Sequence, residues 1–241
     1  MNTAVILAAG MGTRLRAAHA DMPKGFLELG GRPIVEQSIM RLKQAGITDI
    51  VIATGYAAEF YQQLAARHDG LVRLVHNPEF ADSGSMYSLY CARDLINGDF
   101  LLLESDLLYE SRALEVLIGH EHSDAVLLSG PTGAGDEVYV EAPNGLLVGM
   151  SKDRGKLGSV AGELVGICKV SSGLFKLMTS IAQEHFHDSL HFDYETDCLV
   201  AAAQSREISC PVVSDLVWGE IDDPDHLERA RSTILPKLSM P

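Results

Sequence analysis

The stretch Ala4-Val-Ile-Leu-Ala-Ala-Gly-Met-Gly-Thr-Arg14, followed by Pro23-Lys24, decides the fold. A short apolar run leads into a loop with two glycines and an arginine, and the Pro-Lys pair begins nine residues after that arginine. The missing glycine side chains let main-chain N–H groups approach phosphate oxygens, while arginine and lysine neutralise charge. The pattern therefore predicts a strand followed by a phosphate-binding loop for a nucleotide.

Two other glycine motifs fit this stretch less well. A dinucleotide fold needs Gly-x-Gly-x-x-Gly, and Leu15 stands where the third glycine belongs after Gly10 and Gly12. A P-loop needs Gly-x4-Gly-Lys-Ser/Thr, which this sequence lacks. An ordinary strand-turn-helix stays open as an alternative. A dinucleotide-dependent oxidoreductase also stays open as an alternative, and tight NAD binding by the purified protein would support it.

Size and charge limit the class of protein. The 241 residues, 46% of them hydrophobic, suffice for one substantial core, and we expect a single domain over residues 1–241. A net charge of −14 argues against nucleic acid or an anionic membrane as a partner, because both require basic surfaces. Four widely spaced cysteines without a C-x-x-C pair, and no visible targeting segment, predict a cytoplasmic protein with reduced thiols.

Strand and helix signals alternate through the first half of the chain. The expected strands are short apolar runs at residues 4–9, 50–54, 72–75, 100–103 and 125–128. Helix-period segments lie between them, at residues 34–45, 57–68, 85–95 and 112–120. Buried strands separated by amphipathic helices predict an α/β fold, with a Rossmann-like, mostly parallel sheet flanked by helices.

The pattern changes after Pro131. Residues 137–141 and 146–150 are strand-like and flank Asn144-Gly145, which is a strong hairpin signal. With a further strand at 162–170, we expect an antiparallel subregion at about residues 131–170 on the substrate side, as an extension that makes the sheet mixed or as a small lid. Helices at 173–185 and 194–204, a strand at 207–213 and a closing helix at 224–234 complete the chain.

The motif Leu7-Ala-Ala-Gly-x-Gly-x-Arg14 with Pro23-Lys24 is much longer than a lone glycine pair. It resembles the signature of the sugar-nucleotide pyrophosphorylase and cytidylyltransferase superfamily of nucleotidyltransferases. The resemblance implies the nucleotide-diphospho-sugar transferase-like fold. It also implies that the loop cradles the phosphates through main-chain N–H groups, while Arg14 and Lys24 stabilise the α-phosphate and the departing pyrophosphate.

Two acidic segments are candidates for a metal site. Asp106 ends a buried strand, and ligands in open α/β sheets lie just beyond the carboxyl ends of strands. In Glu220-Ile-Asp-Asp223, the last aspartate suits the N-cap of the closing helix and leaves Asp222 free. In the resembled superfamily, a strand-end aspartate and one from a late Glu-Ile-Asp segment hold Mg²⁺, which assigns Asp106 and Asp222. A turn residue and a helix cap are the alternatives.

The helix expected to begin at Ser85 narrows the resemblance. Asn77-x-x-Phe80, the following Tyr-Ser-Leu helix and the closing Glu-Ile-Asp segment are similar to the phosphocholine and phosphonate cytidylyltransferases, which use CTP. This resemblance covers nearly the whole chain. The hydroxyls of Ser85, Tyr87 and Ser88 are suited to reading a base edge, and helix capping and packing are equally open.

The acceptor is suggested by segments from the second half. Asp136-Glu-Val-Tyr-Val140, Met150-Ser-Lys152 and Gly162-Glu163 look most like the 2-aminoethylphosphonate cytidylyltransferases. Lys152 matches the superfamily lysine that contacts the acceptor's phosphate or phosphonate, and an exposed loop lysine is the alternative. Glu163, Asp193 and Glu195 offer carboxylates, which suit a primary ammonium better than a quaternary one. For Asp193, a plain helix cap stays open.

The hypothesis is an enzyme that transfers CMP from CTP to a small phosphonate, with 2-aminoethylphosphonate as first choice. The reaction would be a Mg²⁺-dependent in-line displacement that releases pyrophosphate. Phosphocholine, another phosphonate or a sugar phosphate as acceptor, and a non-catalytic nucleotide-binding regulatory protein, are the alternatives. The expected partners are CTP and a small phosphonate or phosphate-ester acceptor, with a homodimer as an option and neither nucleic acid nor membrane.

The predicted site residues form four groups. The catalytic residues are Arg14, Lys24 and Lys152. The nucleotide-binding residues are Leu7, Ala8, Ala9, Gly10, Met11, Gly12, Thr13, Ser85, Tyr87, Ser88 and Ser105. The acceptor-binding residues are Glu163, Asp193, Glu195 and Lys152, and the metal ligands are Asp106 and Asp222.

Overall fold

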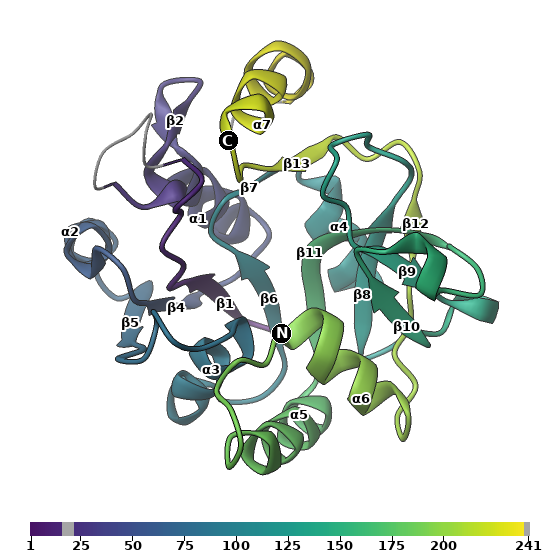
Figure 1. Ribbon diagram of the computed structural model, residues 1–241. Helices are drawn as coiled ribbons and strands as arrows, with labels where there is room; N and C mark the ends of the chain where they lie inside the picture. The colour runs from purple at the N-terminus through teal and green to yellow at the C-terminus, as the bar shows by residue number, and fades with distance from the viewer. Residues whose placement is uncertain (16–21, 239–241) are drawn as a thin grey trace.

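The structure is a computed structural model that describes residues 1–15 and 22–238. Its main sheet is mixed, and the strands from the first half of the chain are mostly parallel. Its strands among these residues are β1 (Thr3–Ala8), β4 (Asp49–Thr54), β5 (Val72–His76), β6 (Phe100–Glu104), β8 (Ala125–Ser129), β9 (Tyr139–Glu141), β10 (Gly149–Ser151), β11 (Gly162–Val170) and β12 (Val212–Val213). The order is β10-β9-β11-β6-β1-β4-β5, with β8 paired to β11 and to β12 (Figure 1). Strands β6, β1, β4 and β5 are parallel, as predicted, and β11 runs antiparallel to β6, β8 and β9.

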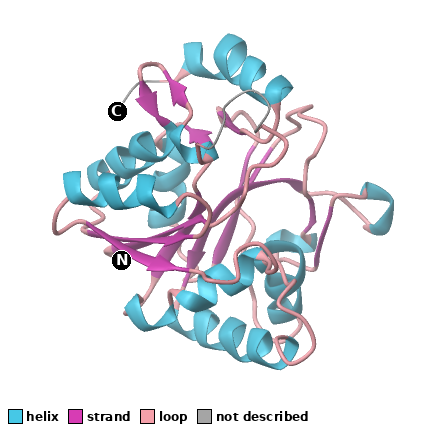
Figure 2. Ribbon diagram, turned by 60° about the vertical axis from the view of Figure 1, so that its left-hand side comes forward, coloured by secondary structure: helices cyan, strands magenta, loops and turns pink. Residues whose placement is uncertain are grey.

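Helices cover both faces of the sheet (Figure 2). Side chains alternate along β1, so that Val5 and Leu7 belong to one buried cluster and Ala4, Ile6 and Ala8 to another. The first cluster includes residues of α3 (Ser85–Cys91), α5 (Ser172–His185) and α6 (Val200–Ala203). The second includes residues of α1 (Ile34–Gln44), α2 (Ala58–Arg67) and α4 (Arg112–Gly119). This three-layer arrangement confirms the fold class predicted from the sequence.

Two small ribbons lie outside the main sheet, and the sequence did not predict them. Strand β7 (Leu107–Tyr109) pairs antiparallel with β13 (Trp218–Glu220), and β2 (Glu28–Leu29) pairs with β3 (Arg32–Pro33). Strands of two or three residues are too short to show a period-2 pattern. Helix α7 (Pro224–Arg229) follows β13 and packs in a third buried cluster, which includes Leu227 and Leu108.

The expected Asn-Gly hairpin is present in altered form. Strands β9 and β10 pair antiparallel, and Asn144 and Gly145 both have positive φ, at 57° and 76°. The second strand was placed too early, because β10 begins at Gly149 rather than at residue 146. The intervening main chain bonds elsewhere: the N–H of Leu147 donates to the carbonyl of Ile208. The strand expected at 207–213 was correspondingly too long, since only β12 continues there as a strand.

The last two predicted helices are present with local irregularities. The segment predicted at 194–204 begins as a π-helical turn at Tyr194–Leu199 and continues as α6. The closing helix consists of α7 and a π-helical turn at Ala230–Ile234, and the side chain of Asp223 caps α7, as predicted. Three of the four free cysteines are buried, and Cys91 is half-buried. Among the described residues, no helix is long and apolar enough to cross a membrane.

Candidate active site

A cavity of about 250 Å³ lies where the loops after β1 and β6 come together, at the carboxyl ends of two adjacent parallel strands. This is the position at which open α/β sheets bind ligands. At Gly12, φ is 58°, and a Cβ atom there would lie 3.0 Å from Cγ of Lys24. Glycine at this position therefore lets the loop turn while the lysine passes beside it.

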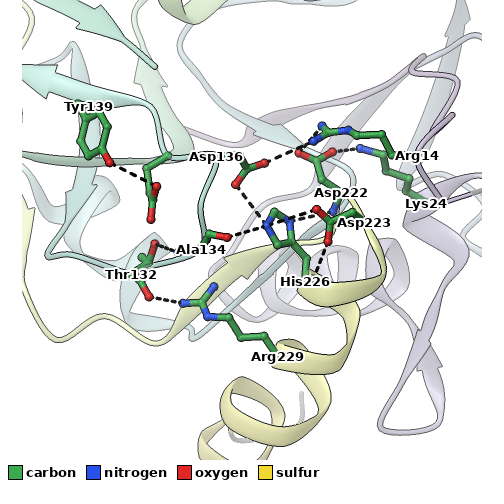
Figure 3. Close-up of polar contacts among 11 residues, drawn as sticks. Arg14, Lys24, Thr132, Ala134, Asp136, Tyr139, Asp222, Asp223, His226 and Arg229 are labelled. Atoms are coloured by element: carbon green, nitrogen blue, oxygen red, sulfur yellow. Dashed lines mark hydrogen bonds and ion pairs between the residues drawn. The ribbon is translucent and has the colours of Figure 1, made fainter. Parts of the chain in front are cut away.

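Lys24 lies between the two aspartates that were predicted to bind metal. Its Nζ is 3.1 Å from Oδ2 of Asp106 and also contacts Oδ1 of Asp222 (Figure 3 draws the second contact). Burial alone would lower the pKa of Lys24, but the charges of Asp106 and Asp222 outweigh burial and raise it. The ammonium therefore stays charged in a largely enclosed position.

The β7–β13 ribbon brings the two aspartates together. Glu220 pairs with Leu107 across the ribbon, and the N–H of Ile221 donates to the carbonyl of Asp106 at 3.2 Å. Asp106 immediately precedes β7, and Asp222 follows two residues after the end of β13. The ribbon's register thus places both carboxylates at one end of the ribbon.

Arg14 contacts the other oxygen of Asp222. Its Nη2 is 2.8 Å from Oδ2 of Asp222, and its Nη1 is 3.7 Å from Oδ2 of Asp136. Burial alone would raise the pKa of Asp222, but Lys24 and Arg14 lower it to about 2. Asp222 is therefore ionised at neutral pH and joins both predicted phosphate-binding cations (Figure 3).

Three glutamates line this cavity. Glu104, Glu195 and Glu220 also line a second cavity of about 80 Å³, so the two cavities adjoin at these residues. The pKa values of Glu104 and Glu220 are raised well above the ordinary value by burial and by the neighbouring carboxylates. Burial, followed by the charge of Asp193, raises the pKa of Glu195 to about 7. A cation placed among them would relieve this crowding of like charges.

The predicted acceptor residues are distributed around the second cavity. Lys152, Glu163 and Glu195 line it, whereas Asp193 lines the first cavity. Glu163 is buried, and its Oε2 accepts a hydrogen bond from the N–H of Thr132 at 2.7 Å. Lys152 is exposed at the rim. The second cavity therefore combines two cationic side chains, Lys152 and Arg229, with several carboxylates.

The serines of the predicted base-reading helix are engaged within the protein. The hydroxyl of Ser85 lies 3.2 Å from Oδ1 of Asp193 and accepts from the N–H of Tyr194 at 2.9 Å. Ser88 accepts from the side-chain amide of the buried Asn77 at 3.0 Å. Both serines line the first cavity with part of their surface.

Tyr87 packs in an aromatic group on the outside of α3. Its ring centroid is 5.1 Å from that of Phe186 and 6.3 Å from that of Tyr90. Among the described residues of the predicted nucleotide set, Met11, Thr13 and Tyr87 line neither cavity. The remaining members line the first cavity: Leu7, Ala8, Ala9, Gly10, Gly12, Ser85, Ser88 and Ser105.

Sequence reasoning missed two site glutamates that their spacing could have revealed. Glu104 precedes Asp106 by two positions, and Glu220 precedes Asp222 by two positions. In extended chain, residues two apart point to the same side. Asp136, Tyr61, Phe80 and Gly84 also line the cavities and were not assigned to the site. Asp136 and Phe80 lie in segments that were used only for the family resemblance.

The carboxylates suit a hard divalent cation such as Mg²⁺. Asp106 and Asp222 reach one common point, the Nζ of Lys24, and oxygen atoms of Glu104, Asp106 and Glu220 lie within 4.8 Å of one another. Oxygen ligands of this kind are those that Mg²⁺ prefers. The residues present therefore fit the cation that the sequence suggested.

The chain is similar in sequence to several known proteins. The family model of the MobA-like NTP transferase domain matches residues 4–160. The CMP-5'-(3-aminopropyl)phosphonate synthase of Streptomyces rubellomurinus is 30% identical over 243 residues, which cover 94% of this chain and 38% of that protein. The 2-aminoethylphosphonate cytidylyltransferase of Lancefieldella rimae is 29% identical over 196 residues, 79% of this chain and 77% of that protein.

The fold is also similar to that of a solved structure. The inositol-1-phosphate CTP transferase from T. maritima superposes with a TM-score of 0.82 at 18% identity, over 99% of this chain and 98% of that one. The matches span only 38% to 52% of the length of the first four curated relatives.

Proposed function

The chain belongs to the MobA-like NTP transferase domain family, and from this premise we propose that it transfers CMP from CTP to a small aminoalkyl phosphonate. The first acceptor to test is 2-aminoethylphosphonate. The similarity to two proteins named for phosphonate substrates supports this choice, and one of them is named for 3-aminopropylphosphonate. We also propose that the protein acts in the cytoplasm, on soluble substrates.

The junction of the two cavities is the observation that carries the proposal. An aminoalkyl phosphonate has an anionic end, which must reach the α-phosphate, and a cationic end, which needs carboxylates. Lys24 lines the first cavity and Lys152 the second, and Glu104, Glu195 and Glu220 line both. Among the described residues that line the second cavity, Trp218 is the only aromatic, which favours a primary ammonium over the quaternary one of phosphocholine.

The proposed reaction is a direct displacement at phosphorus. A phosphonate oxygen forms a bond to the α-phosphorus of CTP, the bond to the β-phosphate oxygen breaks, and pyrophosphate leaves. The phosphonate is already anionic at neutral pH, so the protein need not remove a proton. Main-chain N–H groups at Gly10–Gly12 would hold the phosphates, and Arg14 and Lys24 would neutralise the charge that moves to the leaving group.

Asp106 and Asp222 would hold Mg²⁺, which would neutralise phosphate charge when bound. Lys152 would hold the acceptor's phosphonate against the repulsion of the triphosphate. Glu195, with Glu104 and Glu220 beside it, would hold the ammonium. In this scheme catalysis consists of positioning and charge neutralisation by the chain's own residues.

Pyrophosphate release tests the proposal. CTP, UTP, ATP and GTP would each be combined with 2-aminoethylphosphonate, 3-aminopropylphosphonate, phosphocholine and glucose 1-phosphate, with Mg²⁺ and with EDTA. We expect release with CTP and an aminoalkyl phosphonate, and none in EDTA. Release with phosphocholine alone would assign the quaternary acceptor. CTP binding without release from any pair would support a non-catalytic nucleotide-binding protein.

A further inference from the structure

His226, on α7, uses both ring nitrogens to connect two parts of the site. Its Nδ1 lies 3.4 Å from the main-chain nitrogen of Asp222, and its Nε2 lies 3.2 Å from the carbonyl oxygen of Ala134 and 3.4 Å from Oδ1 of Asp136 (Figure 3). The N–H of Asp222 is a donor, so Nδ1 accepts. Nε2 then carries the proton and donates to the carbonyl or the carboxylate. A neutral imidazole satisfies both sides.

The ring is held firmly in this position. The side chain of His226 is 5% exposed, and its main-chain N–H donates to Oδ1 of Asp223, the helix cap, at 2.9 Å. Helix α7 is anchored in turn by Leu227 in the third buried cluster. Neither hydrogen bond of such a buried side chain can be exchanged for water without a cost in free energy. A displacement of the group bonded to one nitrogen is therefore passed on to the group bonded to the other.

The segment that His226 contacts is residues 130–138, which we call the acceptor-side loop. It joins β8 to β9, and five of its residues line the second cavity: Thr132, Ala134, Asp136, Glu137 and Val138. Gly133 and Gly135 have φ of 66° and 103°, so the loop includes backbone that is intrinsically adaptable. Side chains that bond to the loop from outside therefore add to the contacts that fix its conformation.

Two other side chains hold the same loop. Nη2 of Arg229, one turn along α7 from His226, donates to the carbonyl of Thr132 at 3.1 Å, and Glu163 accepts from the N–H of Thr132 at 2.7 Å. Side chains of helix α7 thus form hydrogen bonds with the loop at two residues, Thr132 and Ala134 (Figure 3). The loop in turn carries Asp136, whose Oδ2 is 3.7 Å from Arg14.

We propose that His226 is a positioning residue, which couples the acceptor cavity to the nucleotide cations by tying the acceptor-side loop to Asp222. Moving the loop would move Asp136 away from Arg14 and would alter the wall of the second cavity. It would also free the backbone of Asp222, whose side chain contacts Lys24 and Arg14. This inference rests on the proposed function for the roles of the two cavities.

The test compares His226→Phe, His226→Gln and the wild type. Phenylalanine keeps a flat ring, of somewhat larger volume, and removes both nitrogens, whereas the glutamine amide can still donate and accept. His120→Phe is the matched control, because His120 also bonds through Nε2, to Ser209 at 2.9 Å, near the start of β8 and at the opposite end of that strand from the acceptor-side loop. Arg229→Met removes the second hydrogen bond from α7 to the loop. It is an independent variant should His226→Phe fold poorly.

Hydrogen exchange measured by mass spectrometry tests whether His226 holds the acceptor-side loop, and it does not require enzymatic activity. In His226→Phe we expect amides of residues 130–138 to exchange about tenfold faster, while peptides from β1 and β6 keep their wild-type rates. His226→Gln should restore part of the protection, Arg229→Met should resemble His226→Phe, and His120→Phe should resemble the wild type. Unchanged exchange in the loop of His226→Phe would overturn the proposal.

Steady-state kinetics report the coupling. In His226→Phe we expect KM for the acceptor to rise by about tenfold and kcat to fall, with KM for CTP changed by about twofold or less. A merely structural role would instead lower the amount of active protein and leave both KM values unchanged, which would overturn the coupling. Should the wild type release no pyrophosphate with any acceptor, the proposed function fails, and the exchange comparison still accepts or rejects the tie.

Discussion

Leu107 faces Glu220 across the β7–β13 ribbon, and this one pair sets the position of two aspartates. Asp106 precedes the ribbon on one strand, and Asp222 follows it on the other, so their carboxylates meet at Lys24. A one-residue slip in register would turn one carboxylate away from the other. The three-residue ribbon therefore contributes more to the candidate site than its length suggests.

Replacing Lys24 with methionine should lower kcat by about 10² to 10³-fold, because in the proposed reaction Lys24 neutralises the departing pyrophosphate. It also leaves Asp106 and Asp222 as neighbouring carboxylates without their shared partner. The free energy of unfolding without Mg²⁺ should fall by about 3 kcal/mol, and added Mg²⁺ should restore part of it. Urea denaturation with and without Mg²⁺ measures this, and Lys176→Met, on an exposed face of α5, is the control. Normal turnover would contradict the assignment.

Gly10→Ala should separate folding from ligand binding. A Cβ atom at Gly10 would meet nothing within 4 Å, so the melting temperature should stay within about 2 °C of the wild type. The added methyl group would enter the space through which a phosphate must approach the loop, so CTP affinity should fall by at least about tenfold. Calorimetric titration with CTP measures the affinity. Unchanged affinity would show that the phosphates do not approach the main chain here.

Gly84→Ala should destabilise the wall of the first cavity. Its Cβ atom would lie 2.5 Å from the carbonyl oxygen of Phe192, which is main chain and cannot turn aside. We expect a loss of about 2 kcal/mol or more in the free energy of unfolding, because α3 and the segment at Phe192 must separate. Gly119→Ala is the control, since nothing lies within 4 Å of a Cβ atom there. Equal stability of the two variants would refute this close contact.

Tyr194→Phe should cost about 1 to 3 kcal/mol of unfolding free energy. The hydroxyl of the fully buried Tyr194 donates to Oε1 of Glu104 at 3.0 Å, and phenylalanine leaves that carboxyl without this donor. Tyr90→Phe also removes a hydroxyl hydrogen bond, from Gln183, but at an exposed position, and should change stability by less than about 0.5 kcal/mol. Denaturant unfolding of both variants checks the difference.

Glu195→Gln should change how stability depends on pH. Its pKa is raised from 4.5 to about 7 in the folded protein, so the folded state binds more protons than the unfolded state between these values. Stability contributed by the protonated form is therefore lost as pH rises through about 7. The melting temperature of the variant relative to the wild type should increase from about pH 5 to about pH 8. Glu184→Gln, on the exposed side of α5, should show no such trend.

The fold could be predicted from the sequence because the elements that define it are long and periodic. Strands β1, β4 and β6 are continuous apolar runs, and α1 and α4 are amphipathic. The irregular parts could not be predicted. The main-chain N–H of Leu147 bonds to Ile208, a partner distant in sequence, so Leu147 is not part of the hairpin strand that was expected at residues 146–150.

The candidate site was predictable where residues lie in one motif. The loop at Gly10–Gly12 and the strand-end Asp106 are local features of the sequence. Asp136 and His226 were not predicted, because their meeting depends on a loop and a helix that come together only in the folded chain. For Ser85 the sequence left base reading and helix capping open, and it could not predict that the hydroxyl bonds to Asp193 and Tyr194, which lie more than 100 residues away.

The contact between Lys24 and Asp222 spans 198 positions in the sequence. During synthesis from the N-terminus, the first loop, the parallel strands and Asp106 all emerge well before Asp222 exists. The nascent chain can therefore build most of its sheet while Lys24 has a single aspartate as partner. Contacts of such long range close late and slow folding. Substitutions in β13 and α7 should accordingly act late in folding, after the sheet has formed. They should lower the yield of mature protein by impairing the step in which Asp222 joins Lys24 and Asp106.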